Sequence, residues 1–527
     1  MTQIKRKGLD LVTKLIFISV FAVFILFPLI SMLIYIDADS SKAVFNSAQF
    51  LPSVTHSLIT ALVATVITIA ISFALAVCIS RVNIKLKGFF SIIFTLPMLI
   101  PSISHGMGLL IVLGNNGIIT RALNLSTSIY GFTGIVAGSV MYAFPVAFIM
   151  ISDILKYQDY SPYEAAKILG LGSFRRFSAI TLPYLRKPLI SIIFAVFTMI
   201  ITDYGVPLII GGKYKTLSVL MYEEVIGRLE FKSGAVIGAL LLIPAIVAFL
   251  LDLMNKDKGN MTFVIKPFEP SNKPLSKIFA YVFCSVISLV VVVPIFCFGA
   301  LGFAKRYPID LTLTIRNIEK ALSMEAGTYL VNSLIISVAV ALLGTAVCFL
   351  SAYLTARAKT KLSKVLHLIL ITAAAIPGMV LGLSYAMSFS GTAIYNTMAI
   401  LIAVNVVHFV ASPYMMIYNS LSKINENLED VGKTMGIGKV RMIKDVFLAQ
   451  SMPTVCEMAS YFFVNSMMTI SAVSFLANTS TKPIALMINQ FEANMQLECA
   501  AIVSLAILIV NIIVKAVFRL ITRRKAK

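Results

Sequence analysis

Charged residues are scarce in this sequence, and the short motifs of several enzyme classes are missing. Asp, Glu, Lys and Arg supply 13% of the 527 residues, whereas 59% are hydrophobic. Soluble globular proteins are about half apolar and a quarter charged, so this composition excludes a soluble protein. No G-x-x-x-x-G-K-[ST] loop is present, and we therefore expect no ATP site of that type in the chain. HExxH and GxSxG are also missing, so we predict that the chain is not an enzyme.

Cysteine and histidine form no pattern of a metal or disulfide site. None of the six cysteines belongs to a CxxC pair, and most lie inside apolar runs. Small buried side chains are the simplest interpretation of these cysteines. The four histidines are His56, His105, His367 and His408. Because they are scattered along the chain, we expect packing or hydrogen-bonding roles, no metal site and no cofactor bound by this chain.

Long apolar runs make up much of the sequence. Each is long enough to cross a bilayer as a helix, which needs about 20 residues, and together they predict an all-α integral membrane protein of about twelve transmembrane helices. The run that follows Lys5-Arg6-Lys7 is too long for a cleaved signal peptide. The runs lie near residues 15–36, 57–80, 88–113, 133–153, 188–210, 233–253, 278–304, 332–356, 363–388, 397–420, 456–476 and 499–520.

The basic residues predict how the chain is oriented. The formal net charge is +21, but Lys and Arg stand in short clusters between the apolar runs. A nucleic-acid-binding protein gathers them on soluble faces beside aromatic residues, so no nucleic-acid partner is expected. With the N-terminus inside, 32 basic residues fall in inner segments and 11 in outer segments. This imbalance predicts a multi-pass protein with both termini in the cytoplasm.

The second half of the chain repeats the first. His56-Ser57-Leu58-Ile59 and Asn332-Ser333-Leu334-Ile335 are 276 residues apart, as are Arg81 and Arg357, and Pro101 and Pro377. Each half has six spans, an even number, so the halves should be parallel. We predict a first six-span unit at 1–254, a cytoplasmic linker at 255–277, and a second six-span unit at 278–527.

A long inner loop, 156–187, should contain a short helix. Ser161 is placed to cap it, and Glu164 three residues later would complete a capping box. Ala165 and Ala166 favour a helix with one apolar face. Gly170 and Gly172 then permit a left-handed turn out of the helix.

An equivalent inner loop, 423–453, follows in the second half at an offset of 266. Asn427 replaces the serine and Asp430 replaces the glutamate, while Gly436 and Gly438 match the two glycines. An ordinary amphipathic loop on the membrane surface is the alternative interpretation of one copy. Two copies at equivalent places favour a shared function.

The first loop resembles the EAA loop of type I ABC importer permeases. The resemblance rests on Glu164-Ala165-Ala166, Gly170 and Ile180-Thr181-Leu182-Pro183, and it extends over nearly the whole chain as a fused pair of permease units. The second loop departs from it, since Asp430-Val431-Gly432 stands where the family has Glu-Ala-Ala. We call loops 156–187 and 423–453 the coupling loops.

The resemblance implies partners and a mechanism. Two copies of a cytoplasmic ABC ATPase, which use ATP and Mg, would each receive one coupling loop. Closure of the ATPase pair would rock the two halves from inward-facing to outward-facing. A solute-binding protein outside a bacterial cytoplasmic membrane would deliver the substrate, and the surrounding lipid is the remaining partner.

The substrate pathway has one intramembrane acid as its candidate. Asp203 and Tyr204 interrupt the fifth run, and buried acids are candidates for function; a helix cap is the equal alternative. The matching stretch of the second half offers Ser471 and Ser474. The segment TDYGVPLIIGG, with the sequence onward to Asp252, resembles permeases for 2-aminoethylphosphonate, although that subgroup usually has Phe in place of Tyr204. The resemblance therefore implies a phosphonate such as 2-aminoethylphosphonate as the cargo. Ferric iron, thiamine or polyamines, which related permeases carry, are the alternatives.

An ion-coupled secondary transporter is the competing class. It would also give twelve spans in two parallel halves, but it would not need paired cytoplasmic loops and usually has several acids within its spans. A membrane enzyme would need His, Asp or Glu clustered at one level of the membrane. The sequence shows no such cluster, and the importer remains the favoured function.

Overall fold

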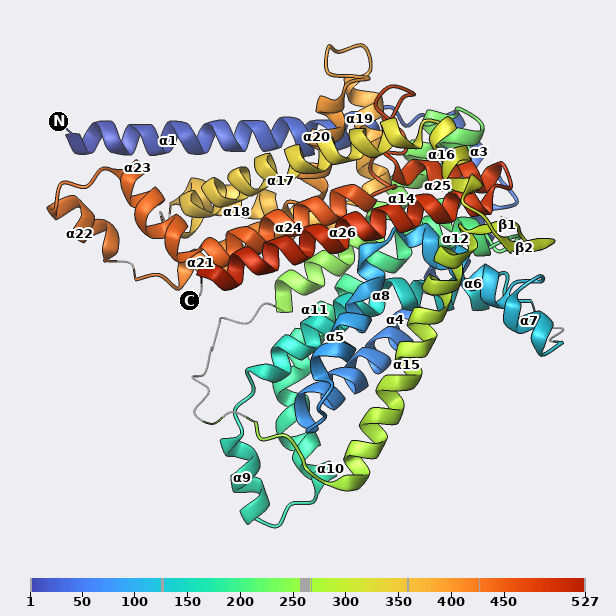
Figure 1. Ribbon diagram of the computed structural model, residues 1–527. Coiled ribbons are helices and arrows are strands. Elements are labelled where there is room, and N and C mark those ends of the chain that lie inside the picture. Colours follow the sequence, from blue (N-terminus) through green and yellow to red (C-terminus); the bar gives the residue numbers. More distant parts are fainter. Residues whose placement is uncertain are drawn as a thin grey trace. The chain divides into compact units, whose positions relative to one another are not determined.

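The computed structural model describes residues 2–124, 128–255, 266, 268–357, 360–425 and 427–525. Within these residues the regular structure is almost entirely helical. The exceptions are the short strands β1 (Ala304–Arg306) and β2 (Asp310–Leu313), which pair as an antiparallel hairpin. The predicted all-α membrane fold is therefore confirmed (Figure 1). Of the predicted linker, residues 256–265 and 267 lie outside the described part.

Helices long and apolar enough to cross a membrane number nine among the described residues. They are Leu11–Ile34, Phe50–Arg81, Ser102–Ala122, Phe132–Lys156, Ser173–Ile201, Phe231–Met254, Pro274–Leu301, Ala326–Ala356 and Leu497–Thr522. Two bent pairs raise the number to eleven. One predicted run, 456–476, overlaps helix α24 (Met452–Met468), whose 17 residues make it shorter than these spans.

The helices pack into two compact units that do not follow the order of the chain. Unit 1 comprises the described residues of Met1–Val44, Glu223–Leu242 and Ile315–Lys527, and unit 2 those of Phe45–Tyr222 and Ile243–Thr314. The first helices of the chain thus belong with its second half, and α15 (Pro274–Leu301) belongs with its first half. The division into permease units at 1–254 and 278–527 stays a prediction.

Unit 2 holds the first coupling loop. Its elements are α4 (Phe50–Arg81), α5 (Lys87–Thr95), η2 (Leu96–Leu99), α6 (Ser102–Leu113), α7 (Ile118–Ala122), α8 (Phe132–Lys156), α9 (Ser161–Ile168), α10 (Ser173–Arg176), η3 (Phe177–Thr181), α11 (Leu182–Ile201), α12 (Gly205–Ile210), α13 (Leu217–Tyr222), α15, β1 and β2. Helix α14 (Phe231–Asn255) is divided between the units.

Unit 1 holds the second coupling loop. Its elements are α1 (Thr2–Phe21), η1 (Ala22–Leu26), α2 (Phe27–Ile34), most of α3 (Ala38–Phe45), η4 (Glu223–Gly227), α16 (Arg316–Ser323), α17 (Ala326–Ala356), α18 (Lys361–Thr372), η5 (Ala373–Ala375), α19 (Gly378–Phe389), α20 (Met398–Phe409), α21 (Ala411–Ser422), α22 (Leu428–Thr434), α23 (Lys439–Met442), η6 (Ile443–Leu448), α24, α25 (Ala485–Ala493) and α26 (Leu497–Lys525).

A proline breaks the same predicted span in each half. Pro101 directly precedes α6 and Pro377 directly precedes α19, both with extended backbone (ψ 149° and 139°). Proline has no N–H to continue a helix and disfavours helical geometry at the residue before it. Helices α18 and α19 consequently meet at 109°. The 276-residue repeat read from the sequence therefore corresponds to a repeated structural break.

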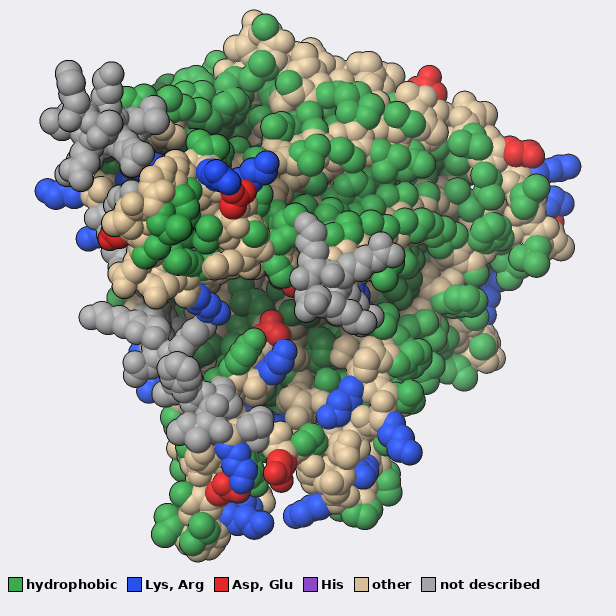
Figure 2. All heavy atoms as spheres, turned by 60° about the vertical axis from the view of Figure 1, so that its left-hand side comes forward, with side chains coloured by type: hydrophobic (Ala, Val, Ile, Leu, Met, Phe, Trp, Pro, Cys, Tyr) green, Lys and Arg blue, Asp and Glu red, His purple; other side chains and the backbone are tan. Residues whose placement is uncertain are grey.

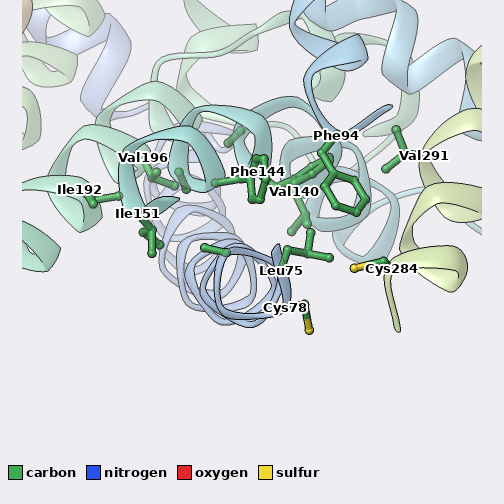
Figure 3. Packing of buried hydrophobic residues seen from close by; sticks show 14 of the residues in the cluster. Leu75, Cys78, Phe94, Val140, Phe144, Ile151, Ile192, Val196, Cys284 and Val291 are labelled. Atoms are coloured by element: carbon green, nitrogen blue, oxygen red, sulfur yellow. The ribbon is translucent and has the colours of Figure 1, made fainter. Parts of the chain in front are cut away.

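The core of unit 2 forms where α4 packs on α8 and α11. The buried face of α4 is rich in small and hydroxyl residues, such as Ala61, Ala64 and Ser72, which allow helices to approach closely. The Ser72 hydroxyl donates to the carbonyl of Phe144, at 3.1 Å. Figure 3 shows Phe144 and Phe94 within this cluster of buried hydrophobic side chains.

Large apolar side chains lie on the outside of the helices, as expected for contact with lipid. Leu62 and Val66 of α4 are 57% and 68% exposed, and Leu342 of α17 is 67% exposed. Figure 2 shows hydrophobic side chains over a wide area of the surface, with Lys and Arg in smaller groups. Large apolar side chains on the outer surface fit contact with a bilayer rather than with water.

Candidate functional site

Helix α9 forms where the sequence predicts it, but its first turn is held differently. The residue before it is Tyr160, which makes no side-chain cap. The backbone N–H and hydroxyl of Ser161 both donate to the carboxylate of Asp159, at 3.2 and 3.1 Å. The predicted capping box of Ser161 and Glu164 is therefore wrong, because Ser161 is already the first residue of the helix. Glu164 instead forms an ion pair with Lys266, with Oε1 2.5 Å from Nζ.

The end of α9 is a Schellman motif. Gly170 has φ +72°, and its N–H donates to the carbonyl of Lys167 at 3.1 Å. The next N–H, of Leu171, donates to the carbonyl of the buried Ala166 at 3.0 Å. These bonds satisfy carbonyls that a helix end leaves free. Gly172 has φ −66° and precedes α10, so only the first glycine makes the predicted left-handed turn.

The start of α22 resembles the prediction more closely. Asn427 directly precedes the helix, and its carbonyl accepts the N–H of Asp430 at 3.1 Å. Glu429, in the first turn, pairs with the guanidinium of Arg357 at the end of α17: Nε lies 2.7 Å from Oε1, and Nη2 binds the other oxygen. The Arg357 side chain is only 4% exposed. An arginine fork on a carboxylate is among the stronger and more directional polar contacts.

Helix α22 ends as α9 does. Gly436 has φ +71°, and the N–H of Ile437 donates to the carbonyl of Gly432 at 2.8 Å. Gly438, with φ −68°, precedes the next short helix, as Gly172 does. The two coupling loops therefore share one backbone design: a short helix, a left-handed glycine, and an extended glycine that starts a second helical turn.

Both loops expose large apolar side chains at equivalent positions. Leu169 is 77% exposed and Met435, its counterpart at an offset of 266, is 70% exposed. Phe174 and its counterpart Val440 are 82% and 81% exposed. Ala165 is exposed as well. Apolar groups concentrated at loop tips are typical of surfaces that bind another protein.

Asp203 lies between two helices and is bonded to the backbone of the second. Helix α11 ends at Ile201, as the sequence suggested, and the N–H of Val206 in α12 donates to Oδ2 of Asp203 at 3.0 Å. Asp203 also borders a small cavity with Ser57, Thr60, Ser139 and Thr216, which has room for about one water molecule. The geometry is that of the capping alternative, and the pathway role stays a prediction.

The predicted pathway residues are divided between the two units, with Asp203 and Tyr204 in unit 2. Tyr204 is fully buried, and its ring stacks on Tyr222 with centroids 5.0 Å apart. Ser471 and Ser474 belong to unit 1, and the Ser474 hydroxyl donates to the carbonyl of Ile470 at 2.5 Å. Their role in a pathway stays a prediction as well.

Two repeated serines, which served only to mark the sequence repeat, each bond to the backbone of a distant segment. The hydroxyl of Ser57 accepts the N–H of Leu217, and that of Ser333 accepts the N–H of Ile484, both at 2.7 Å. The serines are 276 residues apart and their partners 267 apart. The signal was available in the sequence, since a polar residue repeated at the start of an apolar run needs a partner in each copy.

The chain matches a described protein family over most of its length. The family is that of the binding-protein-dependent transport system inner membrane component, and the matched residues are 67–256 and 348–527. The match therefore occurs twice, once in each half, and both matches include a coupling loop.

Several curated transport proteins are similar to the chain. It is 23% identical over 485 residues to the putative ferric transport system permease protein FbpB 1 of Haemophilus influenzae, covering 87% of this chain and 76% of the relative. It is 24% identical over 436 residues to the ferric transport system permease protein FbpB of Actinobacillus pleuropneumoniae, covering 79% and 63%. The molybdenum transport system permease protein ModB of Azotobacter vinelandii is 26% identical over 205 residues, covering 38% and 91%. The last coverage indicates a relative equivalent to about one half of this chain.

Proposed function

Because the chain belongs to the family of binding-protein-dependent transport system inner membrane components, we propose that its coupling loops join it to two copies of a cytoplasmic ATPase and that its cargo is ferric iron. The chain is a fused, two-unit permease component of such an importer. ATP and Mg are used by the ATPase, and a separate solute-binding protein delivers the cargo from outside.

The observation that carries the coupling proposal is the shared design of the two loops. Each has a short helix closed by a left-handed glycine, Gly170 or Gly436, and each exposes apolar side chains at matching positions. A partner with two identical docking sites would engage both loops in the same way. The predicted orientation, with both termini inside, places these loops in the cytoplasm beside the ATPase.

Ends fixed by hydrogen bonds suit a helix that transmits movement. The carbonyls of α9 and α22 are paired through i to i−5 bonds, so a push on the tip displaces the helix rather than unwinding it. The Arg357–Glu429 pair connects α22 with α17. Movement of an ATPase subunit would then reach the membrane-spanning helices of unit 1 through that contact.

The coupling proposal is tested by reconstitution. The full chain, its ATPase and its binding protein are placed in vesicles, and uptake is measured with ATP and with a non-hydrolysable analogue. We expect uptake with ATP alone. Uptake driven by an ion gradient, in vesicles without the ATPase, would contradict the proposal and favour a secondary transporter.

Ferric iron is favoured as cargo because two relatives named for ferric transport align with most of the chain. The resemblance to 2-aminoethylphosphonate permeases covers only the stretch from Thr202 to Asp252 and the later segment TISAVSFL at 469–476. Selectivity in such importers is expected to reside mainly in the binding protein, so the cargo is tested there.

The cargo test is a thermal shift of the partner binding protein. A ligand that binds only the folded state stabilises that state, by about 2.7 kcal/mol at a hundredfold excess over Kd. This stabilisation raises the melting temperature. We expect a shift with ferric citrate and none with 2-aminoethylphosphonate. The reverse result would replace ferric iron by a phosphonate without affecting the coupling proposal.

A further inference from the structure

The described part of the predicted linker lies against the first coupling helix. The carbonyl of Lys266 accepts the N–H of Tyr160 at 2.9 Å, and the N–H of Lys266 donates to Oδ1 of Asp159 at 3.0 Å. Its ammonium group pairs with Glu164. The linker backbone is thus bonded to the two residues that directly precede α9.

The ring of Phe268 fills the space between α9 and the inner end of α4. The guanidinium carbon of Arg81, the last residue of α4, lies 3.3 Å from the centre of this ring. The rings of Tyr160 and Tyr163 contact it edge-on, with centroids 4.7 and 4.9 Å away. A cation on the face of an aromatic ring and aromatic rings at its edge are both favourable geometries.

The linker is fixed again a few residues later. The N–H of Ser271 donates to the carbonyl of Arg81 at 2.7 Å, and the N–H of Asn83 donates to the carbonyl of Ser271 at 3.0 Å. The amide of Asn83 also donates to Asn272, at 2.9 Å. Phe268 therefore lies between two backbone attachments, one beside α9 and one at the end of α4.

In the second half, the coupling helix α22 is connected to the spanning helix α17 directly, without a linker residue between them. Arg357 is the repeat counterpart of Arg81, and it binds Glu429 of α22 directly. The counterpart of Glu429 in the first loop, at the offset of 266, is Tyr163. Arg81 therefore has no carboxylate at that position, and the Phe268 ring lies between Arg81 and Tyr163 instead.

We propose that the described linker residues 266 and 268–272 form a positioning element for the first coupling helix, with Phe268 as the counterpart of the Arg357–Glu429 pair of the second. The segment joins α9 to α4, as the ion pair joins α22 to α17. A linker that merely connects the two predicted halves of the chain would not need these contacts. This inference rests on the proposed function of the coupling loops.

The aromatic contact should matter more than the ion pair. Lys266 and Glu164 are 42% and 41% exposed, and ion pairs at such exposed sites contribute little because water screens them. The half-buried Phe268 has cationic and aromatic neighbours on several sides. The test is therefore built on Phe268.

The test compares Phe268→Ala with a control and a rescue in the full complex. The control is Leu275→Ala, which truncates a side chain of the same region that is 81% exposed. The rescue is Phe268→Ala with Tyr163→Glu, which offers Arg81 a carboxylate at the position that Glu429 has beside Arg357. Two quantities are measured: amide hydrogen exchange of residues 161–171, and solute transported per ATP hydrolysed.

We expect Phe268→Ala to speed the exchange of α9 roughly fivefold, as loss of a partly buried cation–π contact predicts, and to lower transport per ATP. Leu275→Ala should change neither quantity, and the rescue variant should restore both in large part. Parent-like exchange in Phe268→Ala would overturn the inference. If the parent complex itself shows no ATP-dependent transport, the proposed function fails, while the exchange result still reports on the linker.

Discussion

Gly170 and Gly172 are two residues apart but have different backbone requirements. Gly170 is left-handed, with φ +72°, whereas Gly172 is extended, with φ −66°. A Cβ atom would meet nothing within 4 Å at either position. The cost of a side chain at Gly170 is therefore conformational alone, and the pair provides its own control.

We expect Gly170→Ala to impair coupling and Gly172→Ala to have little effect. A non-glycine residue in the left-handed region costs about 1–2 kcal/mol, which would disrupt the end of α9 and raise the ratio of ATP hydrolysed to solute transported. The check is this ratio in reconstituted vesicles. Equal ratios for the two variants would remove the left-handed turn from the mechanism.

Asp203 offers a second prediction at this scale. Asp203→Ala leaves the N–H of Val206 without its acceptor, at a cost of about 1–3 kcal/mol for a buried donor, whereas the amide oxygen in Asp203→Asn can still accept. We expect a lower melting temperature in detergent for the alanine variant and a near-parent value for the asparagine variant. Equal stability of both variants, with uptake lost in both, would instead support a role of the charge in the pathway.

At the scale of the element, the C-terminal end of α17 is connected to α22. Arg357 donates to the carbonyls of Ile424 and Asn425 at 2.7 and 2.9 Å, besides its pair with Glu429. One side chain thus holds both the segment before α22 and its first turn. Lysine could not reproduce this, because its ammonium group lacks the planar fork.

We expect Arg357→Lys to loosen α22 while leaving α9 unaffected. Losing charge-assisted hydrogen bonds of about 2 kcal/mol should speed amide exchange over residues 428–434 and lower transport per ATP. Hydrogen exchange of both helices in the same sample checks this prediction. Unchanged exchange at α22, or an equal increase at α9, would contradict it.

Much at the scale of elements could be predicted from the sequence. The short helices of both coupling loops follow from local patterns and appear where expected, and most of the apolar runs contain spanning helices. The sequence predicts one span for each of the runs 88–113 and 363–388, so the breaks at Pro101 and Pro377 are not among its predictions. The hydrogen bonds at the start of α9 could not be predicted, because Ser161 donates to Asp159 instead of capping the helix, and the same carboxylate also accepts the N–H of Lys266, which is over a hundred residues away. Contacts of that separation leave no local signal.

At the scale of the whole molecule, the first helices of the chain pack with its second half. Pro28 has no N–H to donate to the carbonyl of Phe24 four residues earlier, and the hydroxyl of Tyr385 in α19 donates to that carbonyl at 2.6 Å. Tyr385 is fully buried. A carbonyl that lacks its α-helical donor inside the continuous helix Leu11–Ile34 is thus bonded by a residue 361 positions later.

We expect Tyr385→Phe to destabilise the protein and Pro28→Ala to rescue it. The first change removes the hydroxyl that donates to the Phe24 carbonyl, at a cost of about 1–2 kcal/mol, and the second supplies an N–H from within the helix. Melting temperatures in detergent for the single and double variants check this coupling. Strictly additive effects would show that the bond is not the link between these segments.

The exchange of first helices also explains which part of the architecture the sequence left undetermined. Internal repeats indicated two similar halves, and both matched the family. Repetition shows which segments are alike, however, and not which copy of a helix each segment contacts. An apolar helix such as α15 suits either bundle, so its place in unit 2 depends on shape complementarity, such as the close approach of Gly108 to Pro294.

This exchange has a consequence for how the protein is made. Phe24 leaves the ribosome 361 residues before Tyr385, and at 5–20 residues per second the delay is on the order of 20–70 s. During that interval the Phe24 carbonyl lacks the hydrogen bond from Tyr385. We therefore expect an insertase or a membrane chaperone to bind the first helices during this delay.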